Sequence, residues 1–226
     1  MADILVFDGV TKRYDGAETA VTALEDVSFS ARAGETVAVM GPSGCGKSTL
    51  LHLAGAIDRP TSGRVLIDSR PTEAMRDAEL TRLRRRRIGF VFQFFHLLPT
   101  LTVEENIELP LLLAGGPAAD REARVRELVE RLGLSARARH RPHQLSGGEQ
   151  QRVAIGRALA PRPSIILADE PTGNLDSATG RSILDLLTGL PKSDGVTLIL
   201  ATHEHEAAAR ADRVLHLKDG RLQPAD

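Results

Sequence analysis

The sequence predicts an α/β protein with a mainly parallel sheet, an antiparallel β part near the N-terminus and a helical subdomain inserted between strands. Three observations predict this fold. Strand-like bursts dominate the first third of the chain, helical apolar spacing extends from Val103 to about Leu159, and apolar strands alternate with helices in the last quarter. Continuous apolar strands that alternate with helices are typical of a parallel sheet covered on both faces.

Periodicity and chain breaks place the elements in order. Strands are expected at residues 4–10, 27–31, 36–40, 64–68, 88–92, 164–169, 196–202 and 213–218. Helices are expected at 47–57, 78–87, 103–114, 119–134, after Ser146, at 178–190 and at 204–211.

Composition and charge restrict the class of protein. The 226 residues are 42% hydrophobic and 26% charged, which predicts one globular domain over 1–226. Within it we expect a core lobe, about 1–92 and 163–226, and a helical lobe, about 94–162. The net charge of −1 argues against general nucleic-acid binding. We expect neither a signal peptide nor a membrane span, and the single cysteine excludes an internal disulfide.

The loop GPSGCGKST (residues 41–49) fits the pattern G-x-x-x-x-G-K-[ST] and stands between an apolar strand and a helix. Its glycines let backbone N–H groups and a helix start face phosphate oxygens, while Lys47 reaches the terminal phosphates and Ser48 ligates Mg²⁺. This predicts a P-loop NTPase core. The expected nucleotide contacts are Gly41, Ser43, Gly44, Cys45, Gly46, Lys47, Ser48 and Thr49.

Cys45 occupies a variable position of this loop. A thiol beside a helix N-terminus can have a lowered pKa. We therefore expect alkylation of Cys45 to inhibit the protein, and MgATP to protect it.

The run IILADE places two carboxylates at the end of a buried strand. Asp169 is suited to hold Mg²⁺ through water, and Glu170 is suited to polarise an attacking water as a general base. The alternative is a solvated strand edge or a helix cap. The upstream glycine loop favours the catalytic interpretation.

A second glycine turn, LSGGEQ, precedes a long amphipathic stretch. Ser146 as N-cap with Glu149 three residues later makes a capping box, which would explain a helix start alone. It does not explain Gly147 and Gly148, because glycine is unfavourable in a first helical turn unless something must approach the backbone closely.

Taken together, the motifs resemble the ABC-type ATPases. In order, GPSGCGKST, Gln93 after IGFVF, LSGGEQQR, IILADEPTGNLD and His203 after LILAT match the Walker A, Q-loop, signature, Walker B with D-loop, and H-loop motifs. The likeness covers almost the whole chain. It implies ATP hydrolysis with Mg²⁺ by two copies paired head to tail, each ATP lying between the glycine loop of one copy and the signature turn of the other.

For the signature side, the resemblance implies contacts across the pair. Ser146, Gly147 and Gly148 would meet the γ-phosphate held by the partner copy. Asp176, in GNLD, would contact the partner near its glycine loop.

For the cavity side, the resemblance implies further roles. Gln93 would touch Mg²⁺ and the attacking water and report the nucleotide state to the helical lobe. His203 would bond the γ-phosphate and orient Glu170. Tyr14 looks like the aromatic that stacks on adenine, with an ordinary strand aromatic as the alternative. A metal pair at HEHE (203–206) is disfavoured, because its histidines lack the i,i+4 spacing of helical zinc ligands.

The resemblance also implies partners. The segment Phe94–Pro99 follows the Q-loop, where the family receives an integral membrane permease, so the chain would lie peripherally on the cytoplasmic face of the membrane. HLLP and ENIELPLLLAG look like the branch of macrolide-exporter, lipoprotein-releasing and cell-division ATPases. An ATPase of a polar amino-acid importer is the alternative.

A soluble ABC ATPase acting on nucleic acid is a weaker alternative. The stretch between glycine loop and signature has no room for a coiled coil. The basic run RLRRRRI (residues 82–88) lacks interleaved aromatics and is typical of a solvated helix face near phosphate or anionic lipid.

Overall fold

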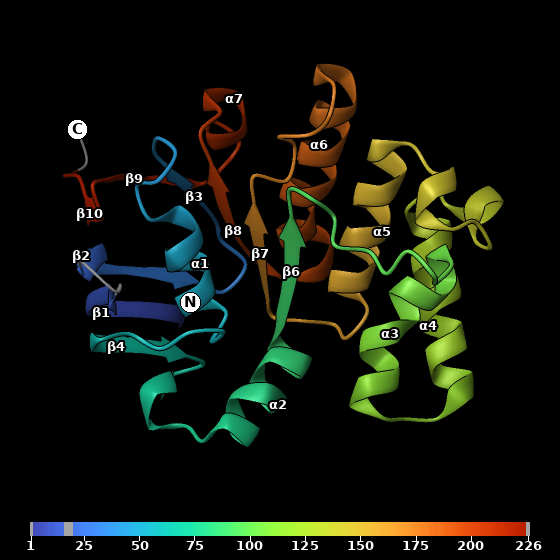
Figure 1. The fold of residues 1–226 in the computed structure, drawn as a ribbon. Coiled ribbons are helices and arrows are strands. Elements are labelled where there is room, and N and C mark those ends of the chain that lie inside the picture. Colours follow the sequence, from blue (N-terminus) through green and yellow to red (C-terminus); the bar gives the residue numbers. More distant parts are fainter. Residues whose placement is uncertain (1, 16–19, 225–226) are drawn as a thin grey trace.

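The computed structural model describes residues 2–15 and 20–224 and contains two sheets (Figure 1). The strands are β1 (Asp3–Asp15), β2 (Ala20–Arg32), β3 (Thr36–Met40), β4 (Ser62–Ile67), β5 (Arg70–Pro71), β6 (Ile88–Phe92), β7 (Ile165–Asp169), β8 (Thr197–Thr202), β9 (Arg213–Lys218) and β10 (Arg221–Leu222). The smaller sheet is antiparallel, in the order β2-β1-β4-β5. The larger has the order β10-β9-β3-β8-β7-β6 and is parallel except at β10. The predicted fold class is confirmed.

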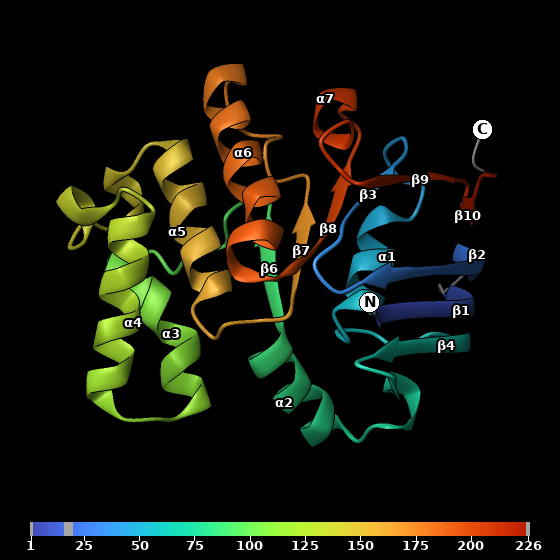
Figure 2. The ribbon, with the colours of Figure 1, turned by 180° about the vertical axis from the view of Figure 1, so that it is seen from behind.

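Helices cover both faces of the larger sheet. They are α1 (Lys47–Ala54), α2 (Asp77–Arg87), α3 (Val103–Ala114), α4 (Ala118–Arg131), α5 (Gly147–Leu159), α6 (Ser177–Asp194) and α7 (His205–Ala208), with short 3-10 turns at Thr72–Ala74, Ser135–Arg137 and Pro142–Gln144. Helices α3, α4 and α5 follow β6 and stand at one end of the molecule in both views (Figures 1 and 2). None of the described helices combines the length and apolar character that a membrane crossing requires.

Two apolar cores lie on opposite faces of the larger sheet. Ile165 and Leu167 of β7 pack with α1 and the antiparallel sheet, whereas Ile166 and Ala168 pack with α5 and α6. Side chains alternate between the faces along a strand. Because both faces are buried, the first four residues of β7 are apolar, as predicted, and the strand ends with Asp169.

Several element ends differ from the sequence predictions. Strands β1 and β2 are longer than the expected 4–10 and 27–31, and α1 ends at Ala54 rather than at 57. Helix α7 runs from His205 to Ala208 and is therefore shorter than the expected 204–211. Helix α6 continues beyond the expected end at 190 to Asp194, where Gly195 adopts the left-handed conformation (φ 66°) that terminates helices.

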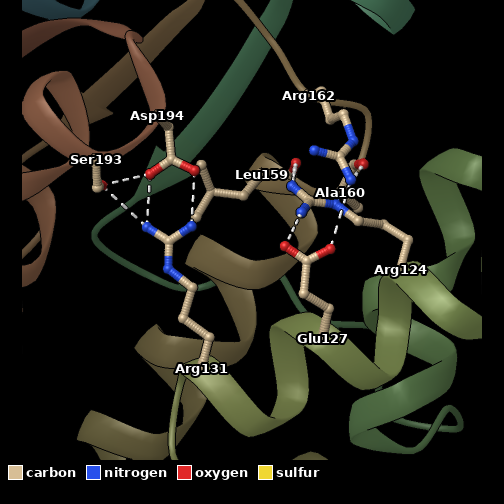
Figure 3. Close-up of polar contacts among 8 residues, drawn as sticks. All are labelled: Arg124, Glu127, Arg131, Leu159, Ala160, Arg162, Ser193 and Asp194. Carbon is tan, nitrogen blue, oxygen red and sulfur yellow. Dashed lines mark hydrogen bonds and ion pairs between the residues drawn. The ribbon is translucent and has the colours of Figure 1, made fainter.

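Arginines of α4 anchor it to two other helices (Figure 3). The buried Arg124 donates to the carbonyls of Leu159 (2.9 Å) and Ala160 (3.4 Å) at the end of α5. Arg131 forms a two-pronged pair with Asp194 at the end of α6. Cations at helix C-termini meet unpaired carbonyls and the negative end of the helix dipole. The helical segment is therefore tied to the sheet-covering helix α6 by polar contacts as well as by packing.

The strand order decides where loops meet. Strand β8 lies between β3 and β7, and the register pairs Met40 with Thr202 and Asp169 with Ala201. Since the three strands are parallel, the segments after them leave the sheet at one edge, as in other open α/β sheets with sites at the strand ends.

Candidate active site

The glycine loop joins β3 to α1 in a backbone path that only glycine fits at two positions. Gly46 has φ 110°, and a Cβ there would lie 2.4 Å from the Ala23 carbonyl oxygen. A Cβ on Gly41 would lie 2.1 Å from the Leu217 carbonyl oxygen. The loop and the start of α1 therefore pack directly against neighbouring backbone. The first N–H groups of a helix have no partner within the helix, so those of α1 face the loop.

Lys47 begins α1 and is buried. Its Nζ donates to the carbonyls of Gly41 (2.7 Å) and Pro42 (3.1 Å) and lies 3.4 Å from Glu170 Oε1. The ammonium is thus held inside the loop next to the end of β7. A buried cation at this place supplies positive charge with little screening by water.

Glu170 follows β7 in a left-handed conformation (φ 45°), which is uncommon for a residue other than glycine. Its N–H donates to the Ala201 carbonyl at 2.9 Å, which extends the hydrogen bonding of β7 with β8 past the last strand residue. The His203 Nδ1 lies 2.9 Å from Glu170 Oε2. Adjacent parallel strands thus deliver the glutamate and the histidine to one point.

Asp169 is the last residue of β7. Burial raises the pKa of its carboxyl and the charge of Glu170 raises it further, while a hydrogen bond with the Ser48 side chain lowers it. The pair joins the glycine loop to the end of β7 through two oxygen-bearing side chains.

A cavity of about 880 Å³ brings most predicted residues together: it is lined by Ser43, Gly44, Gly46, Lys47, Ser48, Thr49, Gln93, Asp169, Glu170 and His203. This volume is in the range of small-molecule sites. The lining also includes Val21, Thr22, Ala23, Pro42, His52, Phe92, Phe94 and His96. Phe94 and His96 belong to the segment expected to contact a permease. No motif marked Val21, Thr22 and Ala23, because only the packing of β2 brings them to the loop.

Gln93 is bound to a residue that sequence reasoning did not select. Its Nε2 donates to Asn174 Oδ1 at 3.2 Å, and Asn174 Nδ2 donates back to the Gln93 carbonyl at 3.0 Å. A Cβ on Gly173 would lie 2.7 Å from Gln93 Nε2. The reciprocal amide pair needs Asn174 in the GNLD segment, and the motif alone carried no signal for that partner.

Tyr14 does not line the cavity. Its hydroxyl donates to Asp58 Oδ2 at 3.1 Å, and the Lys12 ammonium lies 4.8 Å from the ring centroid. Val21, its partner across β1 and β2, lines the cavity instead. The Lys12 ammonium thus already contacts the Tyr14 ring, while 39% of the tyrosine stays exposed.

Cys45 also does not line the cavity, and its burial argues against the reactivity expected for it. The residue is 4% exposed and belongs to the apolar core beneath the loop. A buried thiol is shielded from alkylating reagents. The loop pattern did not show that this variable position points inward, and burial argues against the expected inhibition.

The signature turn lies outside this cavity. Ser146 caps α5: its Oγ accepts from the Glu149 N–H at 3.3 Å, and its own N–H donates to Glu149 Oε2 at 2.8 Å. A Cβ on Gly148 would lie 2.4 Å from Thr179 Cγ2, and one on Gly147 would lie 3.1 Å from Leu175 Cδ2. Packing against Leu175 and Thr179 therefore favours small residues here, a reason that the sequence did not reveal.

Asp176, the last predicted site residue, caps α6. Its Oδ1 accepts from the N–H groups of Ala178 (3.1 Å) and Thr179 (3.0 Å). Hydrogen bonds with Thr179 lower the pKa of this carboxyl. Asp176 and the signature turn are thus next to each other, away from the cavity lining.

Comparison with known proteins decides the family. A family profile described as "ABC transporter" matches residues 24–173, a span that contains the glycine loop, the signature turn and both carboxylates. The chain belongs to the ABC transporter family. This ABC protein is an ATP-binding ATPase subunit, and the resemblance found in its sequence is confirmed.

Relatives of the ABC protein place it in one branch. It is 49% identical to the lipoprotein-releasing system ATP-binding protein LolD of Cereibacter sphaeroides, over 98% of this chain and 100% of the relative. It is 47% identical to the macrolide export ATP-binding/permease protein MacB 2 of Aeromonas hydrophila subsp. hydrophila, over 97% of this chain but 34% of that protein. The expected branch is confirmed.

A solved structure supports the same fold for the ABC protein. The dimeric ATP-binding cassette MJ0796 in a post-hydrolysis state with ADP and Pi has a TM-score of 0.90 and 46% identity, covering 98% of this chain and 97% of its own.

Proposed function

We propose that this ABC ATPase drives a membrane complex that exports or extracts its cargo, and that two copies complete each ATP site. The observation that supports this most directly is the separation within one chain. Lys47 and Glu170 line the cavity, whereas the exposed Ser146 and its glycines do not. The N-terminus of a helix suits a phosphate, so a second copy is needed to bring it to the nucleotide.

Mg²⁺ fits the side chains at the loop. Ser48, Gln93 and Asp169 offer hydroxyl, amide and carboxylate oxygens, which are the hard donors that Mg²⁺ prefers, and the first and third already bond each other. When bound, the ion would neutralise phosphate charge during hydrolysis.

In this proposal, each polar side chain of the cavity has a role in one step of ATP hydrolysis. Lys47 Nζ leaves the loop carbonyls for the terminal phosphates. Glu170 then accepts the proton of the attacking water through its carboxylate. His203 holds that carboxylate from the other side and presents its second ring nitrogen to the γ-phosphate. Gln93, which pairs with Asn174, would offer its amide oxygen to the ion.

Across the dimer, the remaining predicted residues meet the partner copy. Ser146, Gly147 and Gly148 contact the partner's γ-phosphate, and Asp176 lies near the partner's glycine loop. The dimeric relative supports this arrangement. Tyr14 contributes a face to the base, next to the cavity-lining Val21.

We further propose that a permease binds near Phe94–Pro99 and places the ATPase on the cytoplasmic face of the membrane. Phe94 is 68% exposed and Leu98 is 43% exposed, an apolar surface that suits a protein partner. The names of the two relatives, lipoprotein release and macrolide export, support mechanical work by such a complex. The core lobe, about 1–92 and 163–226, would bind nucleotide, and the helical lobe, about 94–162, would move the permease.

The test uses Glu170→Gln, which keeps the size of the side chain and removes the base. ATP turnover should be lost while binding remains, so the variant should elute as a dimer on size exclusion with MgATP and as a monomer without it. Glu206→Gln, at an exposed glutamate, is the control and should hydrolyse ATP normally. A monomer in saturating ATP would contradict the shared site.

A further inference from the structure

A buried amide joins the signature helix to the cavity. Gln151, in the second turn of α5, is fully buried, and its Nε2 donates to the carbonyls of Pro171 (2.7 Å) and Phe92 (3.3 Å). Phe92 precedes Gln93, and Pro171 follows Glu170. One side chain on the signature helix therefore holds the backbone next to both cavity residues.

The orientation of this amide is fixed by its partners. Two carbonyls face Nε2, so the opposite orientation would place Oε1 against two acceptors. Oε1 has no hydrogen-bond partner among the described residues. A buried acceptor left without a partner disfavours folding, but an apolar side chain would leave the carbonyls of Phe92 and Pro171 without this donor. The amide at Gln151 therefore serves to hold these two carbonyls in place.

The hydrogen bonds of the Gln151 amide lie just beyond the point where the ladder between β6 and β7 ends. The ladder of β6 and β7 ends with Phe92 opposite Asp169. Beyond that pair, the two segments run on to Gln93 and Glu170. The Gln151 amide links them across this gap, so a shift of α5 would displace both segments together.

A second residue of α5 holds the far side of the same loop. Arg157 donates to the carbonyls of Phe95 (2.7 Å) and His96 (2.5 Å), and both residues have left-handed backbone conformations (φ 57° and 48°). Side chains of α5 thus hydrogen-bond the backbone on both sides of Gln93, at Phe92 and at Phe95. Rigid attachment of this kind is a physical route for coupling between two sites.

We propose that Gln151 is a positioning residue that makes hydrolysis in one cavity depend on the ATP bound by the other. The proposal rests on the shared-site function above. The phosphate of the partner's ATP binds the start of α5 and fixes the position of the helix. Through its two hydrogen bonds, Gln151 then fixes the backbone of Phe92 and Pro171. Gln93 and Glu170 therefore adopt the geometry needed for hydrolysis only when phosphate is bound at the signature turn.

The test replaces Gln151 by methionine, which has similar length and no donor. Gln150→Met is the matched control, since Gln150 is the next amide on the same helix, is half-buried, and donates to the Leu145 carbonyl at 3.2 Å. In the full chain, kcat of Gln151→Met should fall at least about tenfold relative to the control. The Hill coefficient for ATP should fall towards 1, with the ATP dissociation constant unchanged within about twofold.

A second set of variants separates positioning from folding and from the shared-site proposal. Glu170→Gln combined with Gln151→Met should still dimerise in ATP, because Gln151 touches no phosphate in the proposal. Gln151→Asn, whose shorter amide cannot reach both carbonyls, should show the same kcat loss if methionine does not fold. Turnover and Hill coefficient equal to those of Gln150→Met would overturn the proposal, as would a fall in ATP affinity parallel to kcat. Failure of the shared site would instead appear as a monomeric Glu170→Gln single variant.

Discussion

His203 and Glu170 form a side-chain pair at the mouth of the cavity, with His203 Nδ1 2.9 Å from Glu170 Oε2. The other carboxylate oxygen lies 3.4 Å from Lys47 Nζ. The carboxylate is thus held from two sides, by groups from β8 and from the glycine loop. Such a pair fixes a general base in place before the reaction starts.

Replacing His203 by alanine should lower kcat roughly a hundredfold, because Glu170 loses the group that orients it. ATP affinity should change little, since Lys47 and the loop remain. Steady-state ATPase assays with equilibrium nucleotide titration measure the two effects separately. His205→Ala, two residues on and exposed, is the control; equal losses in both variants would contradict the role of the pair.

Replacing Asp169 by asparagine should stabilise the fold at neutral pH while abolishing Mg²⁺-dependent turnover. Burial raises the pKa of this carboxyl in the folded state. The folded state therefore binds the proton more tightly than the unfolded state, and stability is lost as the pH rises from the ordinary carboxyl pKa through the raised one. Asparagine carries no charge to desolvate.

The pH profile of thermal unfolding checks this sign. The gain in Tm for Asp169→Asn should be a few degrees at pH 7 and should disappear below about pH 4, where an ordinary aspartate is protonated in the unfolded chain as well. Asp3→Asn, at the exposed start of β1, is the control for the removal of one carboxylate away from the cavity. A gain that persists undiminished at pH 3 would exclude the titration of Asp169 as its cause.

Replacing Gly148 by alanine should destabilise the chain even without nucleotide, because the new Cβ would lie 2.4 Å from Thr179 Cγ2. Overpacking of this kind costs about 1–3 kcal/mol. Denaturant unfolding gives the change in free energy. Adding Thr179→Ser, which removes the opposing methyl group, should restore most of it; no loss in the single variant would refute packing as a reason for the glycine.

Cys45 should react slowly with N-ethylmaleimide whether or not MgATP is present, because its side chain is 4% exposed. Mass spectrometry of timed samples measures the rate. As a control, Ser135→Cys in a Cys45→Ser background places a thiol at an exposed position and should label within minutes. Rapid labelling of Cys45 that MgATP prevents would contradict this prediction and support the expectation from the loop sequence.

Local patterns in the sequence determined the order of elements and the chemistry of the loop. The alternation of apolar runs fixed the fold class, and the spacing from Gly41 to Ser48 fixed a phosphate-binding turn, because both depend on neighbours along the chain. Motif order also selected Gln93, Asp169 and Glu170, which the cavity brings together.

Tertiary structure alone decided which distant atoms meet. Asn174 pairs with Gln93, and Thr179 packs on Gly148, through the docking of segments far apart in the chain. Nothing in the sequence around Cys45 showed that its side chain turns into the core, since the loop pattern constrains its backbone only. The bridge from Gln151 to two strand ends depends on how α5 lies across β6 and β7, and that placement follows from packing of the whole core rather than from any local run of residues.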